Sequence, residues 1–234
     1  MERHSMNEMA VHNIGLIVQA RMESTRLPGK ILMPIGKYPL LEHICRRMAD
    51  VPGKLVIATS TRPANDAVEA FCQERSIAYF RGPEENVLER YVLCACHYGF
   101  QHVVRLTGDN PFPDAYALQR LVRLHLTQQA DFSTSFGVLP IGVGCEVFRR
   151  EMLEYTLHNA NKPHHFEHVD EYLLEHKSEI RNAALPPDES TFAPEVRLTV
   201  DYVEDLVRAR CIVAHAGEMV NTKEAIRLCR SGQC

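Results

Sequence analysis

Three cations stand close together in a loop-like stretch near the start of the chain. Arg21, Arg26 and Lys30 fall within ten residues, interleaved with hydroxyl side chains and a Pro-Gly pair. Guanidinium groups bind phosphate oxygens in a bidentate manner and an ammonium adds a point charge. The stretch therefore suits a polyphosphate. A solvated basic loop explains the same composition equally well, and the stretch matches neither a Walker A motif nor G-x-G-x-x-G.

Two aspartates follow apolar segments that are typical of strands. Asp109 stands in Thr107-Gly108-Asp109, and Asp201 follows Thr199-Val200. Carboxylate oxygens suit a hard divalent cation. Taken alone, Asp109 is better explained as a turn or capping residue, and a helix N-cap is an open interpretation of Asp201. Together with the three cations, however, the pair favours Mg²⁺-assisted phosphoryl or nucleotidyl transfer.

The segments around these motifs alternate between strand and helix. Apolar runs predict strands at 14–18, 54–59, 77–80 and 102–106, and helical spacing predicts helices at 39–48, 63–75, 84–98 and 113–126. Such alternation predicts an α/β fold with a parallel sheet and helices on both faces. Ligands of such sheets bind at the carboxyl ends of the strands, where the basic loop and both aspartates fall.

The second half of the chain departs from this alternation. Strands are predicted at 142–148 and 196–200, helices at 149–159, 166–176 and 202–215, and a Pro-rich loop at 185–194. No long linker separates these segments. We therefore predict a flexible tail over 1–13, then one domain over 14–234 with a small mixed extension within about 135–194.

The composition is that of an ordinary globular protein. The chain has 234 residues and a net charge of −4, with 45% hydrophobic and 24% charged residues. A net negative charge argues against a nucleic-acid partner, because phosphate contacts dominate that binding. Residues 1–13 contain no apolar signal-peptide core, and no apolar run reaches the ~20 residues of a membrane span. We expect a cytoplasmic protein without a membrane partner.

The eight cysteines include no C-x-x-C pair. This spacing argues against a zinc ribbon or a thioredoxin-type site, and it favours a reducing compartment. Cys45, Cys72, Cys94 and Cys96 fall in amphipathic helical runs. We expect these four thiols to be buried and to act as small hydrophobic side chains.

The basic loop also resembles a family signature. The stretch Gln19-Ala20-Arg21-x-x-Ser24-Thr25-Arg26-Leu27-Pro28-Gly29-Lys30 is similar to that of the cytidylyltransferases, which include the 3-deoxy-manno-octulosonate and acylneuraminate enzymes. Similarity continues in order through ILMPIGKYPLLEH (31–43), ATST (58–61), FRG (80–82), ENVLERY (85–91), LTGD (106–109) and LTVD (198–201). The pattern R-G-x-E-x-x-V-L-x-R-Y most resembles the spore-coat polysaccharide branch.

The resemblance implies a fold, a reaction and a set of residues. The fold is a Rossmann-like nucleotide-diphospho-sugar transferase fold, and the reaction is attack of an acceptor oxygen on the α-phosphate of CTP with release of pyrophosphate. Arg21, Arg26, Lys30, Asp109 and Asp201 match the catalytic positions, with Mg²⁺ on the two aspartates. The nucleotide-binding positions are Ala20, Arg21, Ser24, Arg26, Lys30, Thr59, Ser60, Gly82, Arg90, Thr107 and Gly108.

The predicted acceptor region departs from many relatives. Where these have two acidic residues, this chain has Ile141 and Gly144, which disfavours a polyhydroxylated sugar and favours a small anion. Glu146, His165 and His168 are the predicted acceptor residues, with surface or core histidines as a nearly equal alternative and a metal site at these histidines as the least favoured one. The default acceptor is a sugar acid for a surface polysaccharide. One alternative acceptor is a phosphate or phosphonate monoester. The alternative to an enzyme is a catalytically silent nucleotide-binding regulatory module.

The resemblance also implies a homodimer. Relatives build a dimer-forming extension where the strand–helix alternation of this chain loosens, between about 135 and 194. A symmetric dimer would bury the same surface of that extension in both copies.

Overall fold

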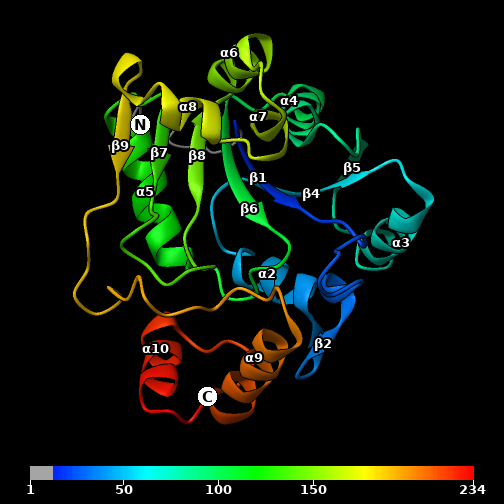
Figure 1. Cartoon of the computed structure of the whole chain (residues 1–234), viewed down its shortest axis with the longest axis vertical. Helices are drawn as coiled ribbons and strands as arrows, with labels where there is room; N and C mark the ends of the chain where they lie inside the picture. Colours follow the sequence, from blue (N-terminus) through cyan, green and yellow to red (C-terminus); the bar gives the residue numbers. More distant parts are fainter. Residues whose placement is uncertain (1–12) are drawn as a thin grey trace, which may run out of the picture.

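The computed structural model describes residues 13–234, and a seven-stranded sheet of order β5-β4-β1-β6-β8-β7-β9 runs through it (Figure 1). The strands are β1 (Ile14–Gln19), β4 (Lys54–Ser60), β5 (Tyr79–Gly82), β6 (His102–Thr107), β7 (Phe132–Thr134), β8 (Glu146–Arg149) and β9 (Asn182–Ala184). The first four lie parallel to one another, and β8 is antiparallel to both β6 and β7. The predicted α/β fold with a mostly parallel sheet and a mixed extension is confirmed.

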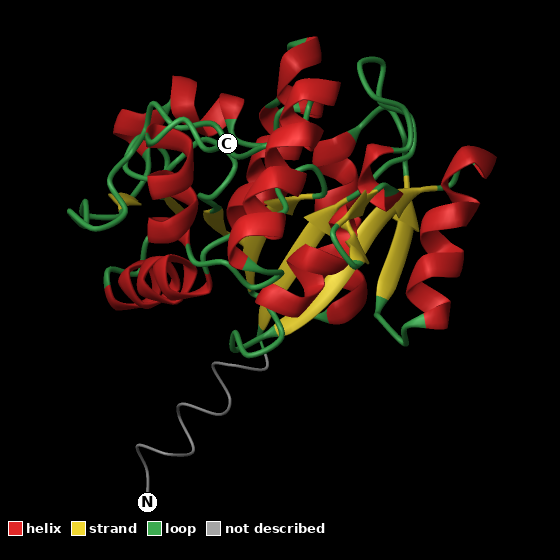
Figure 2. Cartoon of the chain, turned by 90° about the horizontal axis from the view of Figure 1, so that it is seen from below, coloured by secondary structure: helices red, strands yellow, loops and turns green. Residues whose placement is uncertain are grey.

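Helices cover both faces of the sheet (Figure 2). They are α2 (Leu40–Arg47), α3 (Asp66–Glu74), α4 (Val87–Tyr98), α5 (Ala115–Thr127), α6 (Arg150–Asn159), α7 (Pro163–Glu167), α8 (Glu171–Glu175), α9 (Val203–Ala216) and α10 (Thr222–Arg230). Alternate residues of β1 point to opposite faces. Leu16 and Val18 join a core with α2, α3 and α5, whereas Ile17 joins a core with α4 and α6. Both faces of the sheet are thus buried, as a parallel sheet requires.

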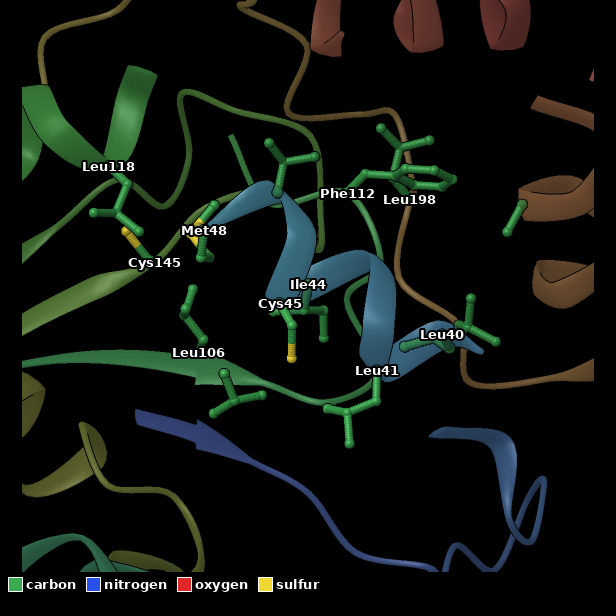
Figure 3. Packing of buried hydrophobic residues seen from close by; sticks show 14 of the residues in the cluster. Leu40, Leu41, Ile44, Cys45, Met48, Leu106, Phe112, Leu118, Cys145 and Leu198 are labelled. Carbon is green, nitrogen blue, oxygen red and sulfur yellow. The ribbon is translucent and has the colours of Figure 1, made fainter. Parts of the chain in front are cut away.

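Helix α2 anchors the segment that follows the basic loop. Its apolar side chains are buried against β6, α5 and the second half of the chain (Figure 3). The side chains in this contact include Leu40, Leu41, Ile44, Cys45, Met48, Leu106, Phe112, Leu118, Cys145 and Leu198. Between the loop and α2 lie a single turn, η1 (Lys30–Leu32), and a hairpin of β2 (Pro34–Ile35) and β3 (Tyr38–Pro39). Burial of α2 therefore holds the C-terminal end of the basic loop in a fixed position.

The second half of the chain differs from its prediction. The expected strand at 142–148 begins only at Glu146, because Gly142 adopts a φ of 90° in a turn, where a Cβ atom would come within 2.5 Å of the Thr199 nitrogen. The expected strand at 196–200 is wrong, since only Arg197 forms a bridge, with Ile141. The expected helix at 166–176 is divided into α7 and α8. The division into tail and single domain stays a prediction, and residues 1–12 lie outside the described part.

The cysteines follow the prediction in part. Cys45, Cys72 and Cys94 are buried, but Cys96 is exposed on α4, so its predicted burial is wrong. Cys211 and Cys234 form a disulfide, which the sequence did not predict. Among the described residues, every helix is too short or too polar to cross a membrane.

Candidate active site

A cavity of about 1140 Å³ opens at the carboxyl ends of β1 and β6. Its walls come from the basic loop, the turn after β6, the segment before β8 and the extended chain that leads into α9. The predicted site residues that line it are Arg21, Ser24, Arg26, Lys30, Thr107, Gly108, Asp109, Glu146, His168 and Asp201. Residues from distant parts of the sequence therefore meet in one place.

Six predicted site residues do not line this cavity: Ala20, Thr59, Ser60, Gly82, Arg90 and His165. All six are buried. Arg90 donates hydrogen bonds of 2.8 Å to the carbonyl oxygens of Pro83 and Glu84, so it fixes the segment that brings Glu84 to the cavity wall. His165 packs beneath the exposed His164, 3.4 Å from Glu175. These residues support the wall from behind.

Lys30 joins the two predicted metal-binding aspartates. Its ammonium lies 3.0 Å from Asp109 Oδ2, 3.0 Å from Asp201 Oδ1 and 2.8 Å from the Val200 carbonyl oxygen. The residue is only 6% exposed, because Gly29 adopts a φ of 72° and turns the chain into η1. A solvated loop would not bury its lysine between two carboxylates. The basic loop is thus held in place by the aspartates that it faces.

Asp201 is surrounded by cations. Besides Lys30 it accepts hydrogen bonds from Arg26 at 2.5 Å and from Arg197 at 2.6 Å. Burial raises the pKa of this carboxyl group, but the hydrogen bonds and charges of its cationic neighbours outweigh burial and hold the pKa below its ordinary value. Asp201 does not cap α9 with its side chain. That role falls to Asp205, which accepts from the backbone N–H groups of Asp201 and Tyr202.

Arg21 reaches across another part of the cavity. Its guanidinium nitrogens lie 3.9 Å from Glu84 and 3.8 Å from Glu167, beyond hydrogen-bond distance in each case. The side chain is 38% exposed. Arg21 therefore keeps donors available for an anionic ligand, whereas Lys30 is fully engaged within the protein.

A buried arginine and glutamic acid form another part of the wall. Arg105 on β6 and Glu146 on β8 stand directly opposite each other in the antiparallel pair, and the Arg105 guanidinium donates a hydrogen bond to Glu146, with Asp170 3.8 Å from Arg105. Burial raises the pKa of Glu146 to about 8; Arg105 opposes this rise and Asp170 adds to it. Glu146 Oε1 and Arg105 Nε have no hydrogen-bond partner within residues 13–234. Sequence reasoning missed Arg105, although an arginine inside an apolar strand is the signal that could have found it.

The raised pKa of Glu146 predicts a pH dependence of stability. Between the ordinary value of 4.5 and about 8, the folded protein holds a proton that the unfolded chain has lost. The contribution of Glu146 to the free energy of unfolding should therefore fall as the pH rises through this window. His125, whose pKa burial lowers to about 3, contributes a slope of the opposite sign below pH 6.5 in both proteins. The measurement is therefore the difference in free energy of unfolding between the wild type and Glu146→Gln in urea, which should fall as the pH rises. Equal slopes for both proteins would contradict the prediction.

Asp109 and Asp201 also fit a divalent cation. Their carboxylate oxygens converge on one positive charge, the Lys30 ammonium, at 3.0 Å each. Hard oxygen donors arranged in this way are those that Mg²⁺ takes in proteins. Asp109 makes this one side-chain contact among the described residues and faces the cavity, so its second oxygen is free to bind a ligand.

Comparisons with known proteins show the family of this chain. A model of the cytidylyltransferase family matches residues 16–213. The chain is 35% identical over 227 residues to the spore coat polysaccharide biosynthesis protein SpsF of Bacillus subtilis, covering 93% of this chain and 94% of that protein. It is similar to the structure of a cytidylyltransferase from Leptospira borgpetersenii serovar Hardjo-bovis, with a TM-score of 0.88, 27% identity and 94% of each chain covered. The fold is also shared with a CMP:2-keto-3-deoxy-manno-octonic acid synthetase solved with CTP, at a TM-score of 0.64 and 19% identity over 87% of this chain and 99% of that one.

Proposed function

The chain belongs to the cytidylyltransferase family, and from this premise we propose that it transfers CMP from CTP to a small anionic acceptor and releases pyrophosphate. One observation carries the proposal: Lys30 lies between Asp109 and Asp201 on the wall of a cavity that Arg21 and Arg26 also line. This is a set of groups that can hold a triphosphate and stabilise the charge that develops as its α-phosphate is attacked.

In this proposal the cations of the basic loop bind the triphosphate. Arg21 is the most available of them, since its contacts with Glu84 and Glu167 are long. Arg26 is half exposed and can turn from Asp201 to a phosphate oxygen. Asp109 and Asp201 would hold Mg²⁺, which when bound polarises phosphate oxygens and offsets their negative charge. Lys30, buried between the two aspartates, keeps their carboxylates together.

The acceptor is assigned to the part of the cavity that Glu146 and His168 line. Ile141 and Gly144 also line the cavity at the positions where many relatives have acidic residues, so fewer groups there repel an anion. The relative from Bacillus subtilis takes part in spore coat polysaccharide biosynthesis by name, which supports a sugar acid. A phosphate or phosphonate monoester is the second candidate, because the replacement of the two acidic positions by Ile141 and Gly144 would also admit it.

Replacing His168 with Ala should raise the KM for the acceptor about tenfold and leave the KM for CTP nearly unchanged. The reason is that His168 lines the cavity from the end of α7, whereas Asp109 follows β6 and Asp201 precedes α9. A lost hydrogen bond to a charged group is worth about 1.5–3 kcal/mol. His164→Ala is the matched control, since His164 contacts Glu175 and does not line the cavity. A change in the CTP constant alone, or in neither, would remove His168 from the acceptor site.

Pyrophosphate release tests the proposed function. The protein is incubated with CTP and Mg²⁺ together with, in turn, a set of sugar acids, a set of phosphate and phosphonate monoesters, and no acceptor. Release that depends on an acceptor supports the transferase and names its class. CTP binding without release in any of these mixtures would instead favour the silent regulatory module.

We also propose that the protein is a homodimer. Helices α4, α6 and α8 cover one face of the sheet and carry the exposed apolar side chains Leu93, Tyr155 and Leu174. A symmetric pair would bury this surface twice. Light scattering at micromolar concentration should give twice the chain mass of 26.6 kDa. A mass of one chain would refute the dimer without affecting the proposed reaction.

A further inference from the structure

Three side chains that commonly bind metals meet at the end of α9 and the last residues of the chain. Cys211 Sγ, a nitrogen of His215 and Cys234 Sγ lie within 4.8 Å of one another. Cys211 and His215 are four residues apart on α9 and so share one face of the helix. The chain returns to that face after α10, and Figure 1 shows its end beside α9.

The return of the chain is fixed by hydrogen bonds. The backbone nitrogens of Gln233 and Cys234 both donate to the carbonyl oxygen of Leu228, at 3.2 and 3.3 Å. Cys211 Sγ lies 3.1 Å from the Gln233 carbonyl oxygen. The two backbone contacts involve neither sulfur, and α10 itself packs with α9 in one core. The fold therefore brings the chain end near α9, and the disulfide completes the contact.

The distances around His215 suit a tetrahedral metal. Its Nδ1 atom lies 3.6 Å from Cys211 Sγ and 3.7 Å from Cys234 Sγ. A tetrahedral Zn²⁺ with ordinary bond lengths separates sulfur and nitrogen ligands by about 3.6 Å and two sulfurs by about 3.8 Å. The nitrogen is thus already placed for both sulfurs. To bind a metal, Nδ1 must give up its 2.9 Å contact with the Cys211 carbonyl oxygen, and the two sulfurs must be reduced so that they can separate.

We propose that the reduced protein binds one Zn²⁺ through Cys211, His215 and Cys234, and that the disulfide is the metal-free state of this site. A dithiol reductant delivers two electrons and two protons to the disulfide and itself becomes a disulfide. Zn²⁺ then binds both thiolates and the neutral imidazole, and the two thiol protons pass to solvent. Two thiolates and an imidazole favour Zn²⁺ over Mg²⁺, which prefers oxygen donors.

The proposed zinc site is separate from the nucleotide site. Asp201 precedes the first turn of α9, and Cys211 lies ten residues further on, or about 15 Å along a helix axis. Its fourth coordination position faces solvent, because His215 is exposed and only three ligand groups gather here among the described residues. Zinc at this site would keep the chain end attached to α9 when the disulfide is open.

Cobalt and zinc binding to the whole protein tests the proposal. The protein is reduced with a phosphine, which takes up oxygen from water to form its oxide and leaves no thiol to compete for metal. Co²⁺ should then give thiolate charge-transfer absorption in the wild type, and Zn²⁺ should abolish it at one equivalent. The oxidised protein should show neither effect. Metal analysis after dialysis should find one zinc per reduced chain.

Variants locate the ligands. Cys234→Ser and His215→Ala should each weaken zinc binding by at least tenfold. Cys96→Ser is the matched control, since Cys96 is an exposed free thiol on α4, and it should bind as the wild type does. The proposal is overturned if the reduced wild type binds no metal, if the oxidised protein binds as much, or if Cys96→Ser loses as much affinity as Cys234→Ser. If a variant does not fold, the cobalt spectra of the reduced and oxidised wild type still test whether thiolates bind the metal.

Discussion

Replacing Asp109 with Asn is expected to lower kcat for pyrophosphate release by about 10²–10³-fold, because loss of one charged ligand from a metal clamp costs several kcal/mol in the transition state. Stability should change little. The Asp109 side chain is partly exposed, and its one side-chain contact among the described residues is with Lys30, which keeps Asp201 as a partner. Steady-state rates at saturating Mg²⁺ and the thermal midpoint measure the two effects separately.

The corresponding change at Asp201 should affect both properties. Its carboxylate offsets the charges of Arg26, Lys30 and Arg197, and Lys30 is buried. Asp201→Asn should therefore lower the thermal midpoint as well as the rate, since it removes the shared counter-charge of three cations, whereas Asp109 pairs with one.

Asp188→Asn is the matched control for both substitutions. Asp188 contacts Arg120 and Ser190 outside the cavity, so this variant should keep the wild-type rate. Near wild-type rates for both Asp109→Asn and Asp201→Asn would contradict the assignment of Mg²⁺ to these two aspartates. Asp109 and Asp201 would then be structural partners of Lys30 only.

The parallel half of the fold could be predicted because its signals are local. Strands β1, β4 and β6 are short, largely apolar runs, and the helices α2, α3, α4 and α5 have apolar residues at helical spacing. The order of such elements fixes which strand ends come together. This is why the sequence alone places the basic loop after β1 and Asp109 after β6 at one edge of the sheet.

The second half depends on contacts that are distant in sequence. Strands β7 and β9 are three residues long, which is too short for an alternation of apolar and polar residues to be recognised. They form because β7 pairs with β8 and β9 pairs with β7. The segment at 196–200 has the apolar composition of a strand but does not pair with a strand of the sheet. Its backbone instead forms hydrogen bonds with the backbone of Ile141 and Asp109. Helix α10 was missed, although Asn221 followed by Glu224 is a recognisable start signal.

The charged partners of the site were missed for a similar reason. Arg197 precedes Asp201 by four residues in an extended segment, and nothing local shows that its guanidinium turns back to both Asp201 and Asp205. Arg105 and Glu146 are 41 residues apart and meet only through the antiparallel register of β6 and β8. Predicting such pairs requires the register, which the sequence did not provide.

Discrimination between CTP and UTP is expected to reach about 10⁴-fold in kcat/KM, with a weaker preference for CTP over dCTP. A site that hydrogen-bonds a polar group of its substrate rejects an analogue lacking that group by such factors, because its own buried polar groups are then left without partners. Gln19 at the end of β1 is a candidate for this role. It lines the cavity, and its Oε1 atom is buried without a hydrogen-bond partner in the described part of the chain.

The exocyclic amino group of cytosine can donate to the Oε1 oxygen of Gln19, whereas uracil presents an oxygen there and pairs with Gln19 only if the amide turns to offer Nε2. Initial rates of pyrophosphate release with CTP, UTP and dCTP, at one fixed acceptor concentration, measure the ratio. Gln19→Met, which keeps the length of the side chain and removes its amide, should lower kcat/KM for CTP more than for UTP. Comparable kcat/KM values for CTP and UTP in the wild type would show that the site does not distinguish the two bases. The proposed specificity for CTP would then be wrong. A less selective nucleotidyl transfer at Lys30, Asp109 and Asp201 would still be consistent with that result.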